Sequence, residues 1–282
     1  MAPLILDGRT LARTREARIR ARALAVADRR GSAPRLLILA FEDRGGSAPW
    51  VGGKERACRA AGIEVHSLVL SGGAGTATGV SRFERRIAEV QADAVFVQFP
   101  FPAGVDGDAF AAAIPPGADI DLMHPDRVRA YLAGGPMAPP LTVRAILALL
   151  ETGETRLHGR EVAVVGSGTP FDRALLEALH RRGAKAELVV PGAAPPATAL
   201  AGASVVVTVA GVPGGVPVEA VPSGATVIDG GYFNPGGRGD VDLSSGAGHL
   251  RALAPVPGGV GPMTVSMLTE AVVERAESST RP

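Results

Sequence analysis

The sequence has few aromatic residues and almost no net charge. Aromatic residues make up 4% of the 282 residues, which argues against a surface that stacks successive nucleotide bases. Lys and Arg number 29 and Asp and Glu number 28, so the formal net charge of +1 gives no long-range field to attract nucleic acid or an anionic membrane. Both kinds of partner are therefore disfavoured, and small-molecule chemistry becomes the default expectation.

Cysteine and export signals are scarce as well. Cys58 is the single cysteine, which excludes an internal disulfide, and neither Cys-x-x-Cys nor His-Glu-x-x-His occurs, so we expect no metal. Residues 1–20 join a short apolar run to an Arg-rich segment and do not resemble a secretory signal. The uncharged stretch between Glu187 and Glu219 is broken by five prolines, so it is not read as a membrane span. A cytoplasmic location fits these features.

Apolar runs and helical patterns alternate along the chain. Apolar runs typical of buried parallel strands lie at 36–40, 63–70, 94–97, 161–166, 187–190, 204–209 and 226–228. Helical patterns lie between them, at about 9–27, 49–61, 81–91 and 142–150, through Leu175 to Leu179, and at 264–276. This alternation predicts an α/β protein.

The chain divides in its middle. Residues 103–140 are rich in Pro and Gly and hold few periodic segments, whereas the strand 161–166 ends in glycine and leads into a helix, as in a Rossmann unit. We expect a catalytic domain over 1–140, completed by a C-terminal helix at 264–282, and a Rossmann-like nucleotide-binding domain over 141–263.

Three segments of the first domain carry polar residues suited to chemistry. Lys54 lies one helical turn beyond Trp50, after a Gly-rich loop that follows a predicted strand, and ligands collect at such sheet edges. Gln98 ends the strand 94–97, where an amide can hold a lysine without neutralising it. Asp121 lies in a loop. Taken alone, each has an ordinary reading as a surface lysine, a strand-ending glutamine or a turn-capping aspartate.

These segments resemble the methylenetetrahydrofolate dehydrogenase/methenyltetrahydrofolate cyclohydrolase family. Ser47, Trp50, Val51 and Lys54 match its Ser-x-x-Tyr-Val-x-x-Lys segment with Trp for Tyr, residues 97–102 are similar to Val-Gln-Leu-Pro-Leu-Pro, and residues 118–122 to Lys-Asp-Val-Asp-Gly, with Leu122 for Gly. Residues 255–265, Pro-Val-Pro-Gly-Gly-Val-Gly-Pro-Met-Thr-Val, reproduce its C-terminal signature.

The resemblance implies interconversion of 5,10-methylene-, 5,10-methenyl- and 10-formyltetrahydrofolate by an NAD- or NADP-dependent dehydrogenase and cyclohydrolase, working as a homodimer. It implies catalytic roles for Lys54, Gln98 and Asp121, with Gln98 bonded to Lys54 and Asp121 to the pterin ring. The implied substrate-binding residues are Trp50, Val97, Pro100, Pro257, Gly258, Gly259 and Pro262. The implied cofactor-binding residues are Gly166, Ser167, Gly168, Thr169, Gly211, Gly231 and Thr264.

The dinucleotide turn departs from the family pattern. Ser167 replaces an arginine that could meet a 2′-phosphate, and Asp172 replaces a glycine that admits the pyrophosphate. A carboxylate there would repel phosphates at a helix N-terminus. Two alternatives therefore stay open: a redox-inactive cyclohydrolase or methylenetetrahydrofolate-dependent one-carbon transfer enzyme, and a non-catalytic folate-binding paralogue.

Overall fold

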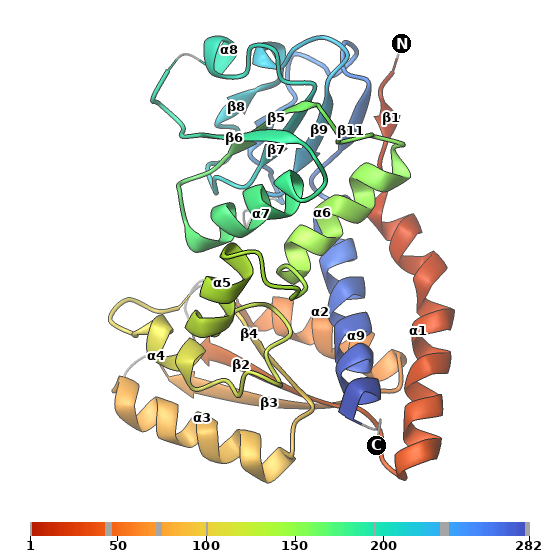
Figure 1. Ribbon diagram of the computed structural model, residues 1–282, viewed down its shortest axis with the longest axis vertical. Helices are drawn as coiled ribbons and strands as arrows, with labels where there is room; N and C mark the ends of the chain where they lie inside the picture. Colours follow the sequence, from red (N-terminus) through yellow and green to blue (C-terminus); the bar gives the residue numbers. More distant parts are fainter. Residues whose placement is uncertain are drawn as a thin grey trace. The chain divides into compact units, whose positions relative to one another are not determined.

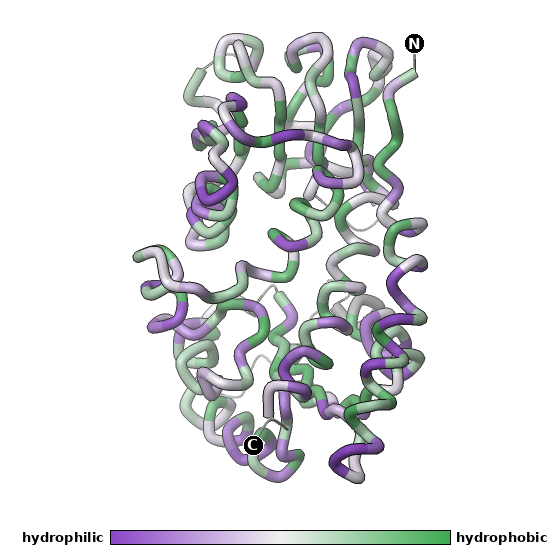
Figure 2. Tube along the Cα trace, turned by 45° about the vertical axis from the view of Figure 1, so that its right-hand side comes forward, coloured by the Kyte–Doolittle hydropathy of each residue, from purple (hydrophilic) through white to green (hydrophobic). Residues whose placement is uncertain are grey.

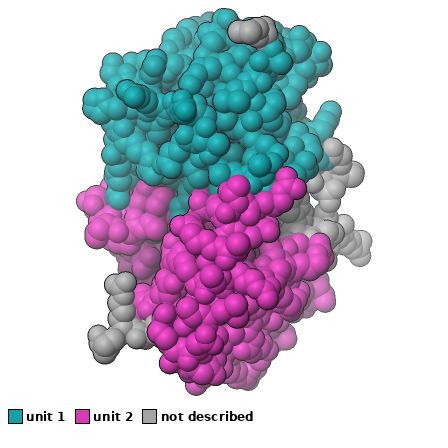
Figure 3. Space-filling model, turned by 90° about the vertical axis from the view of Figure 1, so that its right-hand side faces the viewer, with its two compact units in different colours: residues 1–12, 142–264 teal, residues 13–141, 265–282 magenta. Residues whose placement is uncertain are grey.

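The computed structural model describes residues 2–42, 47–71, 75–99, 101–194, 196–231 and 237–279, with the backbone alone for residues 47–50. Figure 1 shows helices and parallel strands alternating along the chain, which confirms the predicted α/β class. Two compact units divide the chain (Figure 3). Unit 1 comprises residues 1–12 and 142–264, and unit 2 comprises residues 13–141 and 265–282. Residues 1–12 thus belong to unit 1, whereas the sequence predicts them in the first domain.

Unit 1 is built on a fully parallel sheet. Its strands are β1 (Leu4–Ile5), β5 (Glu161–Val165), β6 (Lys185–Val189), β7 (Val205–Thr208), β9 (Thr226–Asp229) and β11 (Ala252–Ala254), in the order β1-β11-β9-β7-β5-β6. From β5 the chain goes first to β6 on one side and then to β7 on the other. The carboxyl ends of β5 and β7 therefore form the switch point where doubly wound sheets bind ligands.

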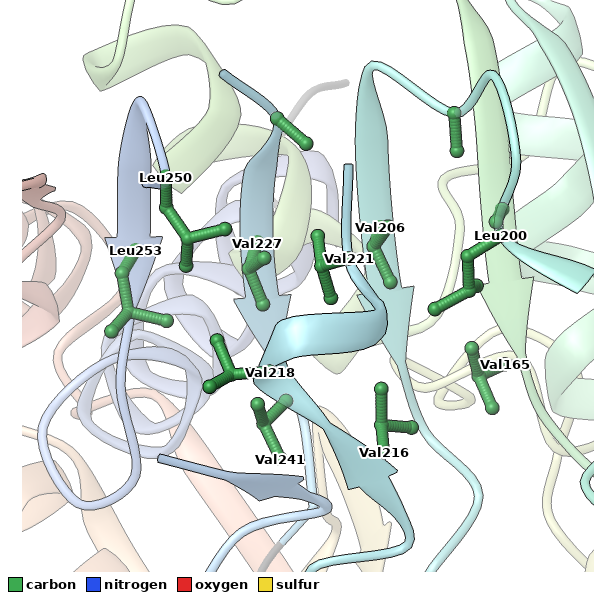
Figure 4. Close-up of a cluster of buried hydrophobic side chains, with 13 residues drawn as sticks. Val165, Leu200, Val206, Val216, Val218, Val221, Val227, Val241, Leu250 and Leu253 are labelled. Carbon is green, nitrogen blue, oxygen red and sulfur yellow. The ribbon is translucent and has the colours of Figure 1, made fainter. Parts of the chain in front are cut away.

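Helices and a small second sheet accompany the main sheet of unit 1. α6 (Leu141–Thr152) precedes β5, α7 (Pro170–His180) joins β5 to β6, and α8 (Pro196–Ala199) precedes β7. β8 (Val216–Pro217) pairs with β10 (Val241–Asp242), and the 3₁₀ turn η1 (Val218–Ala220) follows β8. Figure 4 shows Val206, Val227 and Leu253 of three neighbouring strands beside Val216 and Val218, in one buried apolar cluster.

Unit 2 holds a three-stranded parallel sheet in the order β3-β2-β4. β2 (Arg35–Glu42) is central, β3 (Glu64–Ser71) and β4 (Ala94–Val97) flank it, and α2 (Ser47–Ala60) and α3 (Thr76–Val90) are the crossover helices. Alternate side chains of β2 face opposite sides of the sheet, and Leu37, Leu39 and Phe41 join Phe83 of α3 in the core of this unit.

The remaining helices of unit 2 were only partly expected. α4 (Gly107–Ala112) and α5 (Pro125–Leu132) lie in residues 103–140, where the sequence predicts few periodic segments. α1 (Gly8–Arg30) and α9 (Val260–Ser279) run alongside each other in this unit, where Arg15, Arg18 and Arg22 pair with the buried Glu270. Hydrophilic and hydrophobic stretches alternate along α1 (Figure 2). No helix within the described ranges is long and apolar enough to cross a membrane.

Glu154 adopts a backbone conformation that favours glycine. It follows α6, its φ is 50°, and its N–H donates to Glu151 O at 3.0 Å. Because a side chain in the left-handed region is strained and glycine is not, we expect Glu154→Gly to raise the free energy of unfolding by about 0.5 kcal/mol. Glu151→Gly, in the last turn of α6, should instead lower it, by at most about 1 kcal/mol. Urea unfolding of both variants checks this; a fall for Glu154→Gly would contradict it.

Candidate functional site

Three polar residues of unit 2 meet at the carboxyl edge of its sheet. Lys54 is on α2, which follows β2, and Gln98 directly follows β4. A parallel bridge between Val95 and Asp119 adds a further segment beside β4, and Asp121 lies two residues beyond that bridge. Because parallel strands end at the same edge, residues distant in sequence converge there.

The amine of Lys54 is held by defined contacts. Its Nζ donates to Gln98 Oε1 at 2.8 Å, the hydrogen bond that the resemblance implied. Gln98 Nε2 in turn donates to the carbonyl oxygen of Phe99 at 2.6 Å, which orients the amide with its oxygen toward the lysine. The Nζ also lies 5.4 Å from the centroid of the Phe96 ring. The amine is thereby fixed in position by neutral partners.

Burial changes the acid–base behaviour of Lys54. The residue is 8% exposed, and the loss of solvent lowers the pKa of its amine to about 8. The carboxylate of Asp121 acts in the opposite direction and raises this pKa, but the effect of burial is larger. A fraction of the lysine is therefore neutral near physiological pH, and a neutral amine can accept a proton.

Phe96 and Cys58 belong to this environment, and the sequence analysis predicted neither as a site residue. Cys58 lies one turn beyond Lys54 on α2, and burial raises the pKa of its thiol to about 12. Phe96 precedes Gln98 by two residues, so both belong to one face of the strand. The spacings of four on a helix and two on a strand are the signals that could have identified them.

Two aspartates have different roles in the loop that follows the Val95–Asp119 bridge. Asp119 is buried and accepts from the backbone N–H groups of Met123 and His124, both at 3.0 Å, so its role is to shape the loop. Asp121 Oδ1 accepts from Leu141 N at 2.7 Å. Leu122 has a φ of 54°, the conformation for which the family's glycine is suited, and its side chain is buried.

The other substrate-binding residues expected in this unit are less well placed for side-chain contact. The Val97 side chain is 1% exposed and packs in the core, so only its backbone can face a ligand. Trp50 lies on α2, but its side chain is outside the described residues, and so is Pro100.

The Gly-rich signature forms a tight loop in unit 1. Gly258 has a φ of 119°, and Gly259 N donates to Pro255 O at 2.8 Å. A Cβ on Gly8 would lie 1.9 Å from Gly259 O, so the start of α1 packs directly on this loop. Pro257 precedes the two glycines, and Pro262 lies in the first turn of α9. A Cβ on Gly259 would itself lie 2.9 Å from Pro255 O, so packing within the unit accounts for both Gly8 and Gly259. A substrate-binding role for the loop stays a prediction.

Two buried aspartates organise the loops at the carboxyl ends of β7 and β9. Asp229 accepts from Gly231 N and Asp240 N, each at 3.0 Å, and Asp240 accepts from Ala210 N at 2.8 Å and Gly211 N at 3.3 Å. Burial raises the pKa of both carboxyls. Gly231 is tightly enclosed, because a Cβ there would lie 2.4 Å from Asp240 Oδ1. Gly211 and Gly231, two of the four glycines predicted to bind cofactor, therefore contribute to the structure of these loops.

The turn after β5 contains four of the predicted cofactor-binding residues. Gly168 has a φ of 80°, and Thr169 caps α7. The backbone N–H groups of Ser167 and Thr169 donate to Asp172 Oδ2 at 3.0 and 2.8 Å. A strand, turn and helix at the switch point form the usual binding site of a dinucleotide. The two N–H groups that could donate to its phosphates, however, already donate to the carboxylate of Asp172. Thr264, also predicted to bind cofactor, donates its hydroxyl to Val260 O within α9.

Comparisons with known proteins agree with this arrangement. Residues 6–121 match the family description "Tetrahydrofolate dehydrogenase/cyclohydrolase, catalytic domain", and residues 140–280 match its NAD(P)-binding domain. "Bifunctional protein FolD 2" of Frankia casuarinae is 33% identical over 99% of this chain and 98% of its own length. "Bifunctional protein FolD" of Nocardia farcinica is 34% identical over 98% and 99%.

Solved structures agree as well. The Trypanosoma brucei methylenetetrahydrofolate dehydrogenase-cyclohydrolase, solved with NADP cofactor and inhibitor, has a TM-score of 0.91 and 27% identity over all of both chains. The Campylobacter jejuni FolD structure, at 24% identity, shares the fold with a TM-score of 0.91 over 99% of this chain and 100% of its own. With both halves matched by one family, the chain belongs to the tetrahydrofolate dehydrogenase/cyclohydrolase family.

Proposed function

We propose that Lys54, held by Gln98 and faced by Asp121, is the proton-transfer group of a folate one-carbon enzyme. The protein is a methylenetetrahydrofolate dehydrogenase/methenyltetrahydrofolate cyclohydrolase that uses NAD(P), as its family membership indicates. The observation that supports the proposed role best is the buried amine hydrogen-bonded to Gln98 at 2.8 Å, with a pKa of about 8.

The hydrolytic half needs a base and then an acid. Water adds to the cationic methenyl carbon between N5 and N10, and neutral Lys54 accepts the proton that this water loses. The carbon–N5 bond of the resulting adduct then breaks and N5 takes up a proton from the ammonium of Lys54. The hydroxyl group of the adduct releases its proton to solvent as the C=O bond forms, and the carbon remains on N10 as a formyl group. Gln98 keeps the amine in place in both protonation states, because its oxygen accepts from either.

The oxidative half depends mainly on positioning. When bound, NAD(P) supplies the hydride acceptor for the one-carbon bridge. Asp121 accepts the two-donor edge of the pterin ring, and its backbone bond from Leu141 fixes its orientation. In this proposal folate is bound by two groups of residues. One comprises Trp50, Val97 and Pro100, and the other is the loop with Pro257, Gly258, Gly259 and Pro262. The dinucleotide is bound by Gly166, Ser167, Gly168, Thr169, Gly211, Gly231 and Thr264.

The proposal extends to assembly and location. A homodimer is implied by the family resemblance, and a cytoplasmic site fits a chain with one buried cysteine. Sedimentation equilibrium at micromolar concentration tests the dimer, and a single species of monomer mass would refute it.

Gln98→Glu tests the proposed role of the lysine through its pH profile. Wild-type cyclohydrolase activity should rise with pH around a midpoint near the pKa of about 8, because the neutral amine is the base. A carboxylate beside the amine favours its charged form, so the midpoint should move upward by about one unit or more and the rate at pH 7 should fall about tenfold.

Loss of methenyltetrahydrofolate absorbance, followed from pH 6 to pH 10, measures this shift. Gln91→Glu, at the exposed end of α3, is the matched control and should leave the midpoint in place. An unchanged midpoint in Gln98→Glu would show that Lys54 is not the titrating base.

A further inference from the structure

The carboxylate of Asp172 lies inside the turn that follows β5. Asp172 is the third residue of α7 and is 1% exposed. Its Oδ2 accepts from Ser167 N at 3.0 Å and from Thr169 N at 2.8 Å, and Thr169 Oγ1 accepts in return from Asp172 N. The side chain is therefore enclosed by the turn and does not project from it into solvent.

Gly166 is matched to this carboxylate. A Cβ on Gly166 would lie 2.8 Å from the carboxyl carbon of Asp172 and 2.9 Å from each of its oxygens. A glycine at the end of the first strand usually makes room for a dinucleotide. Here the contact that requires glycine at 166 comes from the chain itself, so Gly166 and Asp172 form one internal unit.

The position of this unit gives it a consequence for ligand binding. The turn lies at the switch point between β5 and β7, and the N-terminus of α7 lies there as well. At such a place backbone N–H groups and the helix dipole attract the diphosphate of a dinucleotide. Two of these N–H groups instead donate to a carboxylate, whose negative charge also opposes a second anion at close range.

We propose that Asp172 is an internal competitor for the dinucleotide diphosphate and thereby sets a weak affinity for NAD(P). Its carboxylate occupies the N–H groups of Ser167 and Thr169 where phosphate oxygens would bind. The dinucleotide must therefore bind through its remaining groups, or displace Asp172 from the turn. This inference rests on the proposed function for the use of NAD(P), and it identifies the residue that limits the binding.

Calorimetric titration with NADP, ADP and adenosine tests the proposal on wild type, Asp172→Asn and Asp172→Gly. We expect Asp172→Gly to bind NADP and ADP at least tenfold more tightly than wild type, because the N–H groups are released and the charge is removed. Adenosine, which has no phosphate, should change less than twofold. Asp172→Asn keeps an acceptor for the turn without the charge, and its affinity for NADP should lie between the other two.

Two controls separate competition from structural damage. Asp106 caps α4 through a carboxylate that accepts from Asp108 N and Ala109 N, and Asp106→Asn should leave NADP affinity unchanged. Binding of a folate analogue by each Asp172 variant, together with its thermal unfolding, shows that the variant is folded.

The outcomes are decisive. If folded Asp172→Gly and Asp172→Asn bind NADP no more tightly than wild type, or if adenosine gains as much as NADP, the inference is wrong. If the variants gain affinity while wild type reduces no NAD(P) with methylenetetrahydrofolate, the inference stands and the oxidative half of the proposed function fails. If wild type already binds NADP as tightly as Asp172→Gly and oxidises its substrate, the function stands and the inference fails.

Discussion

Lys54→Met should lower the cyclohydrolase kcat by about a thousandfold, because a positioned general base contributes a factor of about 10²–10⁴ to the rate. Among the described residues of unit 2, no other amine makes the contacts with Gln98 and Phe96 that hold Lys54. Affinity for a folate analogue should change much less, since Asp121 remains in place. Stopped-flow loss of methenyltetrahydrofolate absorbance gives kcat, and fluorescence titration gives the affinity. A variant with more than a tenth of wild-type kcat would exclude Lys54 as the proton-transfer group.

The same substitution should make the protein more stable. In the folded state the pKa of Lys54 falls from 10.5 to about 8, so the charged amine is disfavoured by burial. Below pH 8 both folded and unfolded states hold the proton, and the folded state bears the full cost, of order 1–3 kcal/mol. Between pH 8 and 10.5 the folded state releases its proton first, so the cost declines as pH rises.

Methionine removes this cost and retains a flexible apolar side chain of similar length. The gain in the free energy of unfolding should therefore be largest below pH 8 and should shrink toward pH 10.5. Urea unfolding at pH 7 and pH 10 measures it. Lys185→Met, which removes an exposed lysine paired with Glu161, is the matched control and should show no such gain. Equal stability of Lys54→Met and wild type at pH 7 would mean that the charged amine is not penalised.

Asp229→Ala should destabilise the protein by about 3 kcal/mol or more. The Asp229 carboxylate is 2% exposed and accepts from Thr208 Oγ1 and from the N–H groups of Gly231, Asp240 and Val241. Truncation leaves these donors buried without an acceptor, and each unsatisfied group costs about 1–3 kcal/mol, partly offset because the buried carboxyl is also removed. Chemical denaturation with circular dichroism measures the change.

Asp242→Ala is the comparison for this effect. Asp242 is exposed and accepts from Ser244 N at 3.0 Å, so its loss should cost about 0.5 kcal/mol. Asp229→Asn should fall between the two, because an amide oxygen can still accept while its NH₂ group faces a donor. If Asp229→Ala and Asp242→Ala cost the same, the buried carboxylate does not hold the loops together.

The order of helices and strands could be predicted from the sequence because long apolar runs in parallel sheets are conspicuous. β4 lies over Ala94–Val97 as predicted, and β2 extends its predicted range only at the ends. The helices α4 and α5 were missed, since six and eight residues give too few turns for a period to emerge. The pairing of β1 with β11 was missed because two exposed residues carry little pattern.

The residues of the candidate site could be proposed from the sequence, and the structure brings Lys54 and Gln98 together, but their burial and acid–base state could not be predicted. The family resemblance pointed to Lys54, Gln98 and Asp121. The burial that lowers the lysine pKa depends on packing, which brings Phe96 of β4 beside Lys54 of α2. Asp172 was recognised as a charge that opposes phosphate. Its enclosure by the N–H groups of the turn depends on a side-chain rotamer, which no sequence pattern specifies.

The connectivity of the two units has a consequence for synthesis on the ribosome. Neither unit is a continuous stretch of chain, and the boundaries at residues 12 and 264 fall inside the helices α1 and α9. β1 cannot find its partner β11, and Arg15 cannot meet Glu270, until nearly the whole chain has emerged. A nascent chain of this protein must therefore keep its early apolar segments from aggregating for most of the time that translation takes.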